Sequence, residues 1–137
     1  PRWFNLDKFY GKPKLKNWVC RCKNIDYELC KLPRQENYIV ELKRNQFSWL
    51  MSVPHNGILI FDESFPALIE WKSDFHPAKS LKESSCRLKR LTICHPKAHT
   101  IKKNLKMLSS DKICFEQNST IQMFAEFITP SGIRFLE

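Results

Sequence analysis

The stretch NYIVELKRNQFSWLMSVPHNGILIF, residues 37–61, decides the fold that the sequence predicts. Two runs within it, residues 38–43 and 47–53, alternate apolar and polar side chains with a period of two, which is typical of half-buried β-strands. Only Arg44, Asn45 and Gln46 separate the runs, so we expect a β-hairpin. Asn56-Gly57 then marks a tight turn, since both residues accept positive φ. The wholly apolar run Ile58–Phe61 predicts a third, buried strand.

The rest of the chain continues the β pattern and adds one helix. Further strands are expected at residues 67–71, 86–94, 112–116, 120–128 and 133–136. After Pro96, the residues Ala98, Ile101, Leu105 and Leu108 recur at helical spacing, which predicts a basic amphipathic helix over about residues 97–108. We therefore predict an α+β, mostly β fold, in which an antiparallel meander forms a curved sheet or a partly closed barrel.

Length and composition set the class of protein. A chain of 137 residues with 42% hydrophobic and 27% charged residues is typical of a single globular domain, here with residues 1–16 as an N-terminal arm. No apolar run approaches the roughly 20 residues of a membrane span. With only three glycines there is no phosphate-binding loop. Because the chain begins with proline, we interpret it as part of a larger protein.

The six cysteines leave two compartments open. They stand at positions 20, 22, 30, 86, 94 and 114, and Asn118–Thr120 is a glycosylation sequon, a combination that occurs in secreted proteins. A chain of this size does not need disulfides to be stable. We therefore expect reduced thiols and an intracellular, nuclear location, with secretion as the alternative.

Positive charge is concentrated in one part of the chain. The chain carries a formal charge of +9, and residues 75–108 hold nine Lys or Arg against one Glu. A basic face of this kind is the usual footprint of a polyanion. We predict a noncatalytic module that contacts the phosphate backbone of nucleic acid, and no small-molecule substrate. The residues expected to make these contacts are Arg87, Lys89, Arg90, Lys97, Lys102, Lys103 and Lys106.

An enzymatic alternative rests on the motif GILIFDESFPALIEWKSD. Glu70 and Lys72 stand at E-x-K spacing and would project to the same side of a strand. The pattern resembles the motif of PD-(D/E)xK nucleases over residues 56–72. The resemblance implies that Asp62, or Asn56 in a degenerate motif, would bind a metal ion together with Glu70, and that Lys72 would be the catalytic lysine.

Two further interpretations concern metal ions and proteins. Cys86, Cys94, His95 and His99 are potential zinc ligands, but their spacing matches no compact zinc motif, so we predict no metal and no cofactor. The basic residues could also dock an acidic partner protein. Nucleic acid, with other protein domains as an alternative, is therefore the expected partner, and no membrane association is expected.

Overall fold

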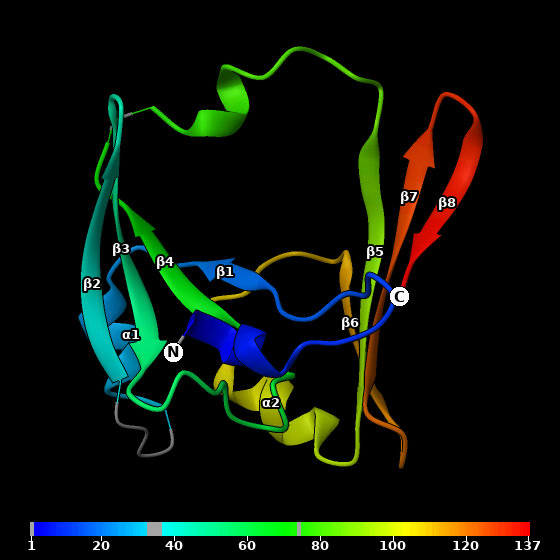
Figure 1. Cartoon of the computed structure of the whole chain (residues 1–137), viewed down its shortest axis with the longest axis horizontal. Helices are drawn as coiled ribbons and strands as arrows, with labels where there is room; N and C mark the ends of the chain where they lie inside the picture. The colour runs from blue at the N-terminus through cyan, green and yellow to red at the C-terminus, as the bar shows by residue number, and fades with distance from the viewer. Residues whose placement is uncertain (1, 33–36, 74) are drawn as a thin grey trace. The chain divides into compact units, whose positions relative to one another are not determined.

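The computed structural model describes residues 2–32, 37–73 and 75–137, and the chain divides into two compact units. Unit 1 comprises Pro1–Phe9 and Asn17–Leu81, and unit 2 comprises Tyr10–Lys16 and Lys82–Glu137. Each unit contains a four-stranded sheet and a short α-helix (Figure 1). The two units are described separately below.

Unit 1 is built on the strand order β1-β4-β3-β2. Strand β1 pairs in parallel with β4, whereas the β4–β3 and β3–β2 pairs are antiparallel. The elements are the 3₁₀-helix η1 (Trp3–Lys8), β1 (Val19–Arg21), α1 (Ile25–Leu29), β2 (Asn37–Arg44), β3 (Phe47–Pro54), β4 (Ala67–Trp71) and the 3₁₀-helix η2 (Pro77–Lys79).

The predicted hairpin is confirmed in β2 and β3. Arg44 pairs with Phe47 across a two-residue turn, in which Asn45 has a φ of 52°. The register also places Val40 opposite Met51 and Leu42 opposite Trp49, so the apolar residues of both strands share one face. The alternation in the sequence therefore gave the correct strands and the correct faces.

The third predicted strand is wrong. The tight turn at Gly57 is present, with its N–H donating to the Pro54 carbonyl at 2.8 Å. Beyond it, however, residues 60–64 form turns rather than a strand, and Phe61 and Asp62 both have a φ of 53°. Leu59 is only 4% exposed, so the apolar run is buried by a folded loop. Strand β4 pairs with β3 in the place that was expected for the strand Ile58–Phe61.

Helix α1 was not predicted from the sequence. The side chain of Asn24 caps it by accepting a hydrogen bond from the Tyr27 N–H at 2.8 Å. Ile25, its first residue, is completely buried. The helix contacts β3 and β4 and therefore covers one face of the unit 1 sheet.

Unit 2 has the strand order β6-β5-β7-β8. Strand β5 pairs in parallel with β6 and antiparallel with β7, and β7 and β8 form the hairpin expected around the Thr129–Gly132 turn. The elements are β5 (Arg87–His95), α2 (Ala98–Asn104), β6 (Ile113–Gln117), β7 (Gln122–Thr129) and β8 (Gly132–Leu136). All four strands lie within one or two residues of the predicted positions.

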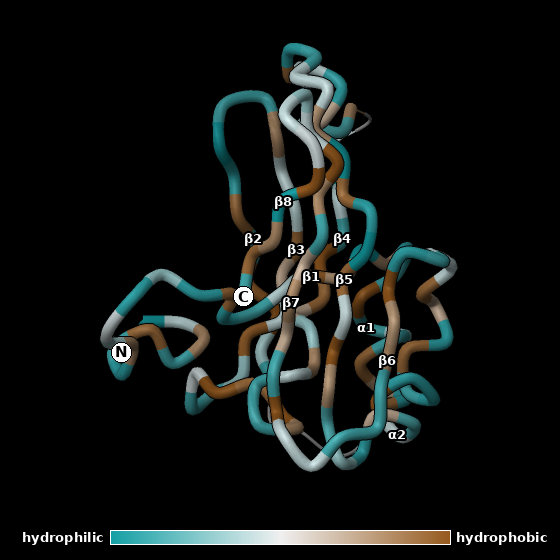
Figure 2. The backbone as a smooth tube through the Cα atoms, turned by 90° about the vertical axis from the view of Figure 1, so that its right-hand side faces the viewer, coloured by the Kyte–Doolittle hydropathy of each residue, from teal (hydrophilic) through white to brown (hydrophobic). Residues whose placement is uncertain are grey.

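The basic amphipathic helix is confirmed as α2, but it is shorter than predicted. It ends at Asn104, because Leu105 leaves the helical conformation with φ −104° and ψ 48°. Ala98, Ile101 and Leu105 are buried as expected, at 1%, 0% and 3% exposed. Leu108 lies beyond the helix, in a turn in which the Leu108 N–H donates to the Leu105 carbonyl. Helix α2 packs mainly against β6, beside which it appears in Figure 2.

The fold class is therefore confirmed only in its coarser form. The structure is β-rich with few helices, but each sheet mixes parallel and antiparallel pairs, and the sheets do not close into a barrel. The antiparallel meander and partly closed barrel were wrong because β1–β4 and β5–β6 are parallel. Parallel pairing needs a crossover between the two strands, which alternation within each strand does not reveal. No helix among the described residues is long and apolar enough to cross a membrane.

Candidate functional site

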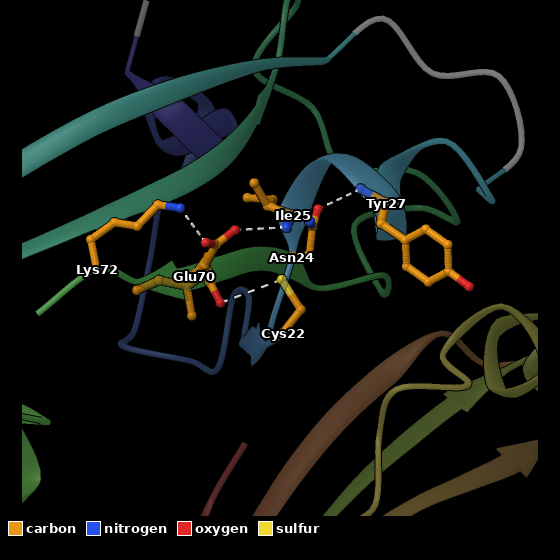
Figure 3. A network of polar contacts seen from close by, with 7 residues as sticks. Cys22, Asn24, Ile25, Tyr27, Glu70 and Lys72 are labelled. Atoms are coloured by element: carbon orange, nitrogen blue, oxygen red, sulfur yellow. Dashed lines mark hydrogen bonds and ion pairs between the residues drawn. The ribbon is translucent and has the colours of Figure 1, made fainter. Parts of the chain in front are cut away.

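Glu70 anchors helix α1 rather than standing in an open site. Its Oε2 accepts a hydrogen bond from the Ile25 N–H at 2.8 Å, and its Oε1 pairs with the ammonium group of Lys72 (Figure 3). The hydrogen bond from Lys72 lowers the pKa of the Glu70 carboxyl; burial opposes this, and the Ile25 N–H adds to it. Glu70 and Lys72 thus share a side, as predicted, but Glu70 holds the start of α1 and Lys72 pairs with Glu70.

The remaining residues of the nuclease motif lie in turns. Asp62 stands in the folded loop before β4, in a left-handed conformation rather than at the end of a strand. Asn56 uses its Oδ1 to accept the Ile58 N–H at 2.9 Å. Among residues 2–32, 37–73 and 75–137, no three His, Cys, Asp or Glu side chains are grouped so that they could hold a metal ion.

The strand half of the basic segment is compensated by carboxylates. Lys89 Nζ lies 3.0 Å from Glu126 Oε2, and Arg90 Nε lies 3.8 Å from Glu126 Oε1. Arg87 pairs with Glu83. Glu126 belongs to β7 and is distant in sequence from Lys89 and Arg90, so the charge count along the chain could not show these ion pairs.

The helix half of the basic segment is not compensated. Lys97, Lys102, Lys103 and Lys106 are exposed, on or next to α2. Within the described ranges none of these four lysines forms an ion pair. The structure thus divides the predicted nucleic-acid-binding residues into a strand group that pairs with Glu83 and Glu126 and a helical group without ion pairs among the described residues.

The four potential zinc ligands have other contacts. His95 is 2% exposed and its Nδ1 accepts the Lys97 N–H at 2.8 Å, which shapes the turn before α2. His99 Nδ1 lies 3.0 Å from Gln117 Oε1. Cys94 is buried with its thiol 3.9 Å from Glu116 Oε2, whereas Cys86 is exposed. The structure therefore does not unite these side chains.

All six cysteines are free thiols in the structure. Burial raises the pKa of both Cys20 and Cys22 to about 11, with a smaller contribution from Glu28 at Cys20 and from Glu70 at Cys22. Both thiols therefore stay protonated at neutral pH and are poor nucleophiles. Their reduced state in solution stays a prediction.

The face of the unit 1 sheet opposite α1 carries a cluster of aromatic side chains. Because Glu70 contacts α1, alternation along β4 directs Trp71 to the face opposite α1, together with its register partner Trp49. The Trp49 and Trp71 ring centroids are 5.3 Å apart, and Phe47 lies 6.5 Å from Trp71. The aromatic cluster is completed by Phe75, which stacks on Phe47, and His76, which meets the edge of Trp71.

One atom of the aromatic cluster has an unmet hydrogen-bonding requirement. The indole Nε1 of Trp49 is buried and has no hydrogen-bond partner among the residues that the structure describes. Trp18 shows the ordinary situation, since its Nε1 donates to the Ser64 carbonyl at 3.0 Å. A buried N–H without an acceptor costs about 1–3 kcal/mol, and ligand sites are a common place to find one. The sequence alone could not single out this N–H, because the missing acceptor is visible only in three dimensions.

Comparison with protein families gives one match. The sequence model of the family described as "glyoxalase-like domain" matches residues 1–109, which include all strands of unit 1 together with β5 and α2. Comparisons with curated proteins and with solved structures found no match.

The family match corrects the predicted function. Glyoxalase-like domains have a β-α-β-β-β fold and are typically enzymatic or bind ligands, so the prediction of nucleic-acid binding is wrong, and the nuclease and the acidic-partner module are not supported either. The nuclear location rested on that prediction and is likewise unsupported. The order β1, α1, β2, β3, β4 of unit 1 agrees with the fold of the family. The match spans more than half of the chain, which therefore belongs to the family of glyoxalase-like domains.

Proposed function

We propose that this chain binds a small organic molecule on the aromatic cluster of unit 1, and that the molecule carries a flat ring and an anionic oxygen group. The unpartnered Nε1–H of Trp49, next to the ring of Trp71, is the observation that carries this proposal. Membership of a family whose members are typically enzymes or ligand-binding domains supports it.

The flat ring follows from the geometry of the cluster. Phe47, Trp49 and Trp71 are half-buried, so each residue keeps accessible surface. Aromatic pairs gain about 0.5–1.5 kcal/mol beyond the burial of their area when the rings stack with an offset or meet edge to face. A planar ligand can therefore gain more from this surface than an aliphatic ligand of the same size.

The anionic oxygen follows from two donors. The Trp49 N–H needs an acceptor, and a carboxylate oxygen is the strongest acceptor available to it. Arg44 stands directly opposite Phe47 in the register of β2 and β3, which places it on the same face. It is exposed and forms no ion pair within the part of the chain that the structure describes. An aromatic carboxylate would use the rings, the N–H and this positive charge together.

Benzoate and cyclohexanecarboxylate are suitable probes, because they share the charge and differ in planarity. In ligand-detected NMR titrations, benzoate should bind the wild-type protein at least several-fold more tightly than cyclohexanecarboxylate. Trp49→Phe keeps a ring but removes the N–H, and should weaken benzoate binding by roughly tenfold or more, since a hydrogen bond to a charged group contributes about 1.5–3 kcal/mol. Trp71→Leu should abolish the preference for benzoate.

Trp18→Phe is the matched control. It removes an indole N–H that already has a protein acceptor, so it should lower the stability of the fold and leave benzoate binding unchanged. Circular dichroism would establish that every variant is folded. Equal binding of the two probes, or unchanged benzoate affinity in Trp49→Phe, would show that the aromatic cluster is part of the core rather than a binding site.

A further inference from the structure

A pocket of about 540 Å³ opens in unit 2 between the end of α2 and strand β6. The strand is the edge strand of its sheet, and Figure 2 shows α2 next to it. Pockets that hold small ligands span about 300–1,000 Å³, so this one has sufficient volume. The lining residues used below are Lys102, Leu105, Lys106, Leu108, Asp111 and Phe115.

Part of the pocket wall is apolar because α2 ends early. Leu105 is buried, but Leu108 and Phe115 are only half-buried. Had the helix continued to residue 108 as its periodicity predicts, Leu108 would have extended the buried stripe. Instead the chain turns after Leu105, and Leu108 becomes part of an open wall beside β6.

The charges at the pocket favour an anion. Lys102 and Lys106 line it, and neither has an ion-pair partner among the described residues. Asp111 is the one carboxylate in the lining, which leaves one positive charge in excess. Lys89 and Arg90 differ in that both pair with Glu126 on a neighbouring strand.

We propose that this pocket binds a small aliphatic carboxylate, with its hydrocarbon chain against Leu105, Leu108 and Phe115 and its carboxylate between Lys102 and Lys106. The site is separate from the aromatic cluster of unit 1 and does not depend on the function proposed for that cluster. Flexible aliphatic chains fill irregular apolar walls, whereas the stacked rings of unit 1 favour planar molecules.

Octanoate is the probe, and 1-octanol is its uncharged counterpart. In a titration followed by ¹H–¹⁵N NMR, octanoate should shift amide signals of residues 102–108 and 113–115 in a saturable manner. Lys102→Gln and Lys106→Gln should each weaken octanoate binding by about two- to fivefold, the range of partly exposed charge pairs. 1-Octanol should bind the wild-type protein more weakly than octanoate does. Its affinity for Lys102→Gln and Lys106→Gln should equal its affinity for the wild-type protein.

Matched controls come from neighbouring positions. Lys103 is on the same helix and exposed but does not line the pocket, so Lys103→Gln should leave octanoate affinity unchanged. Ser110 lines the pocket and Ser109 does not, so Ser110→Phe should block binding of both probes while Ser109→Phe should not.

Three results would overturn the proposal. The first is the absence of saturable shifts in unit 2 up to about 10 mM octanoate, since the dissociation constant would then lie above the millimolar range. The second is 1-octanol binding as tightly as octanoate. The third is Lys103→Gln weakening octanoate binding as much as Lys102→Gln. Loss of benzoate binding in Trp49→Phe bears only on unit 1 and leaves this test unaffected.

Discussion

The two sheets contain the same elements in the same order but arrange their strands differently. In both units a strand is followed by a helix and then by three strands. In unit 1 the first strand, β1, lies at the edge and pairs in parallel with the last strand, β4. In unit 2 the first strand, β5, lies inside the sheet between β6 and β7 (Figure 1). The order of elements along the chain therefore does not determine the order of strands in a sheet.

The length and burial of the first strand account for the difference. Strand β1 has three residues, and only Cys20 in its middle is buried. Strand β5 has nine residues, and Leu91–His95 are buried without interruption. A strand buried on both faces needs neighbours along both edges to satisfy its backbone N–H and C=O groups, whereas a short exposed strand can remain at the edge.

The faces of the two sheets opposite α1 and α2 also differ in chemistry. In unit 1 this face carries Trp49 and Trp71. In unit 2, the contact of His99 with Gln117 places α2 on the Gln117 side, so Glu116 and its register partner Cys94 lie on the opposite face. By register, Phe124 and Phe135 share this face of unit 2, so both sheets carry aromatic side chains opposite their α-helices. We assign the proposed planar ligand to unit 1 because the indole N–H of Trp49 has no partner among the described residues.

Shortening Ile93 is the strongest test of the central position of β5. Ile93 is completely buried, so Ile93→Ala should lower the free energy of unfolding by about 3 kcal/mol, through lost apolar burial and the cavity that remains. Urea unfolding followed by circular dichroism would measure the change.

Ile133→Ala is the matched edge-strand control. Ile133 lies on β8 and is 46% exposed, so the same truncation should cost less than about 1 kcal/mol. Similar losses for Ile93→Ala and Ile133→Ala would contradict the contrast between central and edge strands.

The parts of the fold that the sequence predicts are those with a local signal. The hairpin of β2 and β3 and the buried stripe of α2 follow from periodicity over consecutive residues. Ile58–Phe61 failed because a short apolar run is equally compatible with a buried loop, and α1 was missed because five residues are too few for a periodic pattern. The parallel pairs join residues that are far apart in sequence, so no local pattern indicates them.

The sites were less predictable than the fold. The sequence showed the excess of positive charge after residue 86, but not that Lys89 and Arg90 pair with Glu126 across the sheet. It showed the E-x-K pair, but not that Glu70 is engaged by the first residue of α1. The unpartnered N–H of Trp49 has no sequence signature, because it depends on the lack of a hydrogen-bond acceptor near the indole in the folded structure.

Replacing Glu70 tests whether this carboxylate stabilises unit 1. Its side chain is 12% exposed, and Glu70→Gln keeps an acceptor for the Ile25 N–H but loses the charge that faces Lys72. We expect a loss of about 1 kcal/mol at pH 7, since Lys72 is partly exposed and solvent weakens the pair. Glu41→Gln, at an exposed position on β2, should cost almost nothing.

The loss should depend on pH in a defined direction. The pKa of Glu70 is lowered from its ordinary value of 4.5, so the native state releases this proton more readily than the unfolded chain. The stabilisation is therefore complete above pH 4.5 and disappears as the pH falls through the lowered pKa of the native state. Urea unfolding of wild type and Glu70→Gln at a series of pH values would measure this. A difference that persisted at the lowest pH would show that packing rather than charge is responsible.

Replacing Glu126 should have the smallest effect. It tests the strand half of the basic segment in unit 2, whose cations pair with carboxylates. Its side chain is 14% exposed, whereas its partners Lys89 and Arg90 are 40% and 50% exposed, so the ion pairs are partly screened by water. Glu126→Gln should cost about 0.5 kcal/mol at low ionic strength, and the cost should shrink in about 1 M salt, where charges more than about 3 Å apart are screened. Glu83→Gln removes a carboxylate that pairs with Arg87 with both partners more than half exposed, and should have no measurable effect. If the cost of Glu126→Gln is independent of salt, the carboxylate stabilises the fold through packing rather than through its charge. Lys89 and Arg90 would then be as free as the lysines of α2. The difference between the strand half and the helix half of the basic segment would disappear.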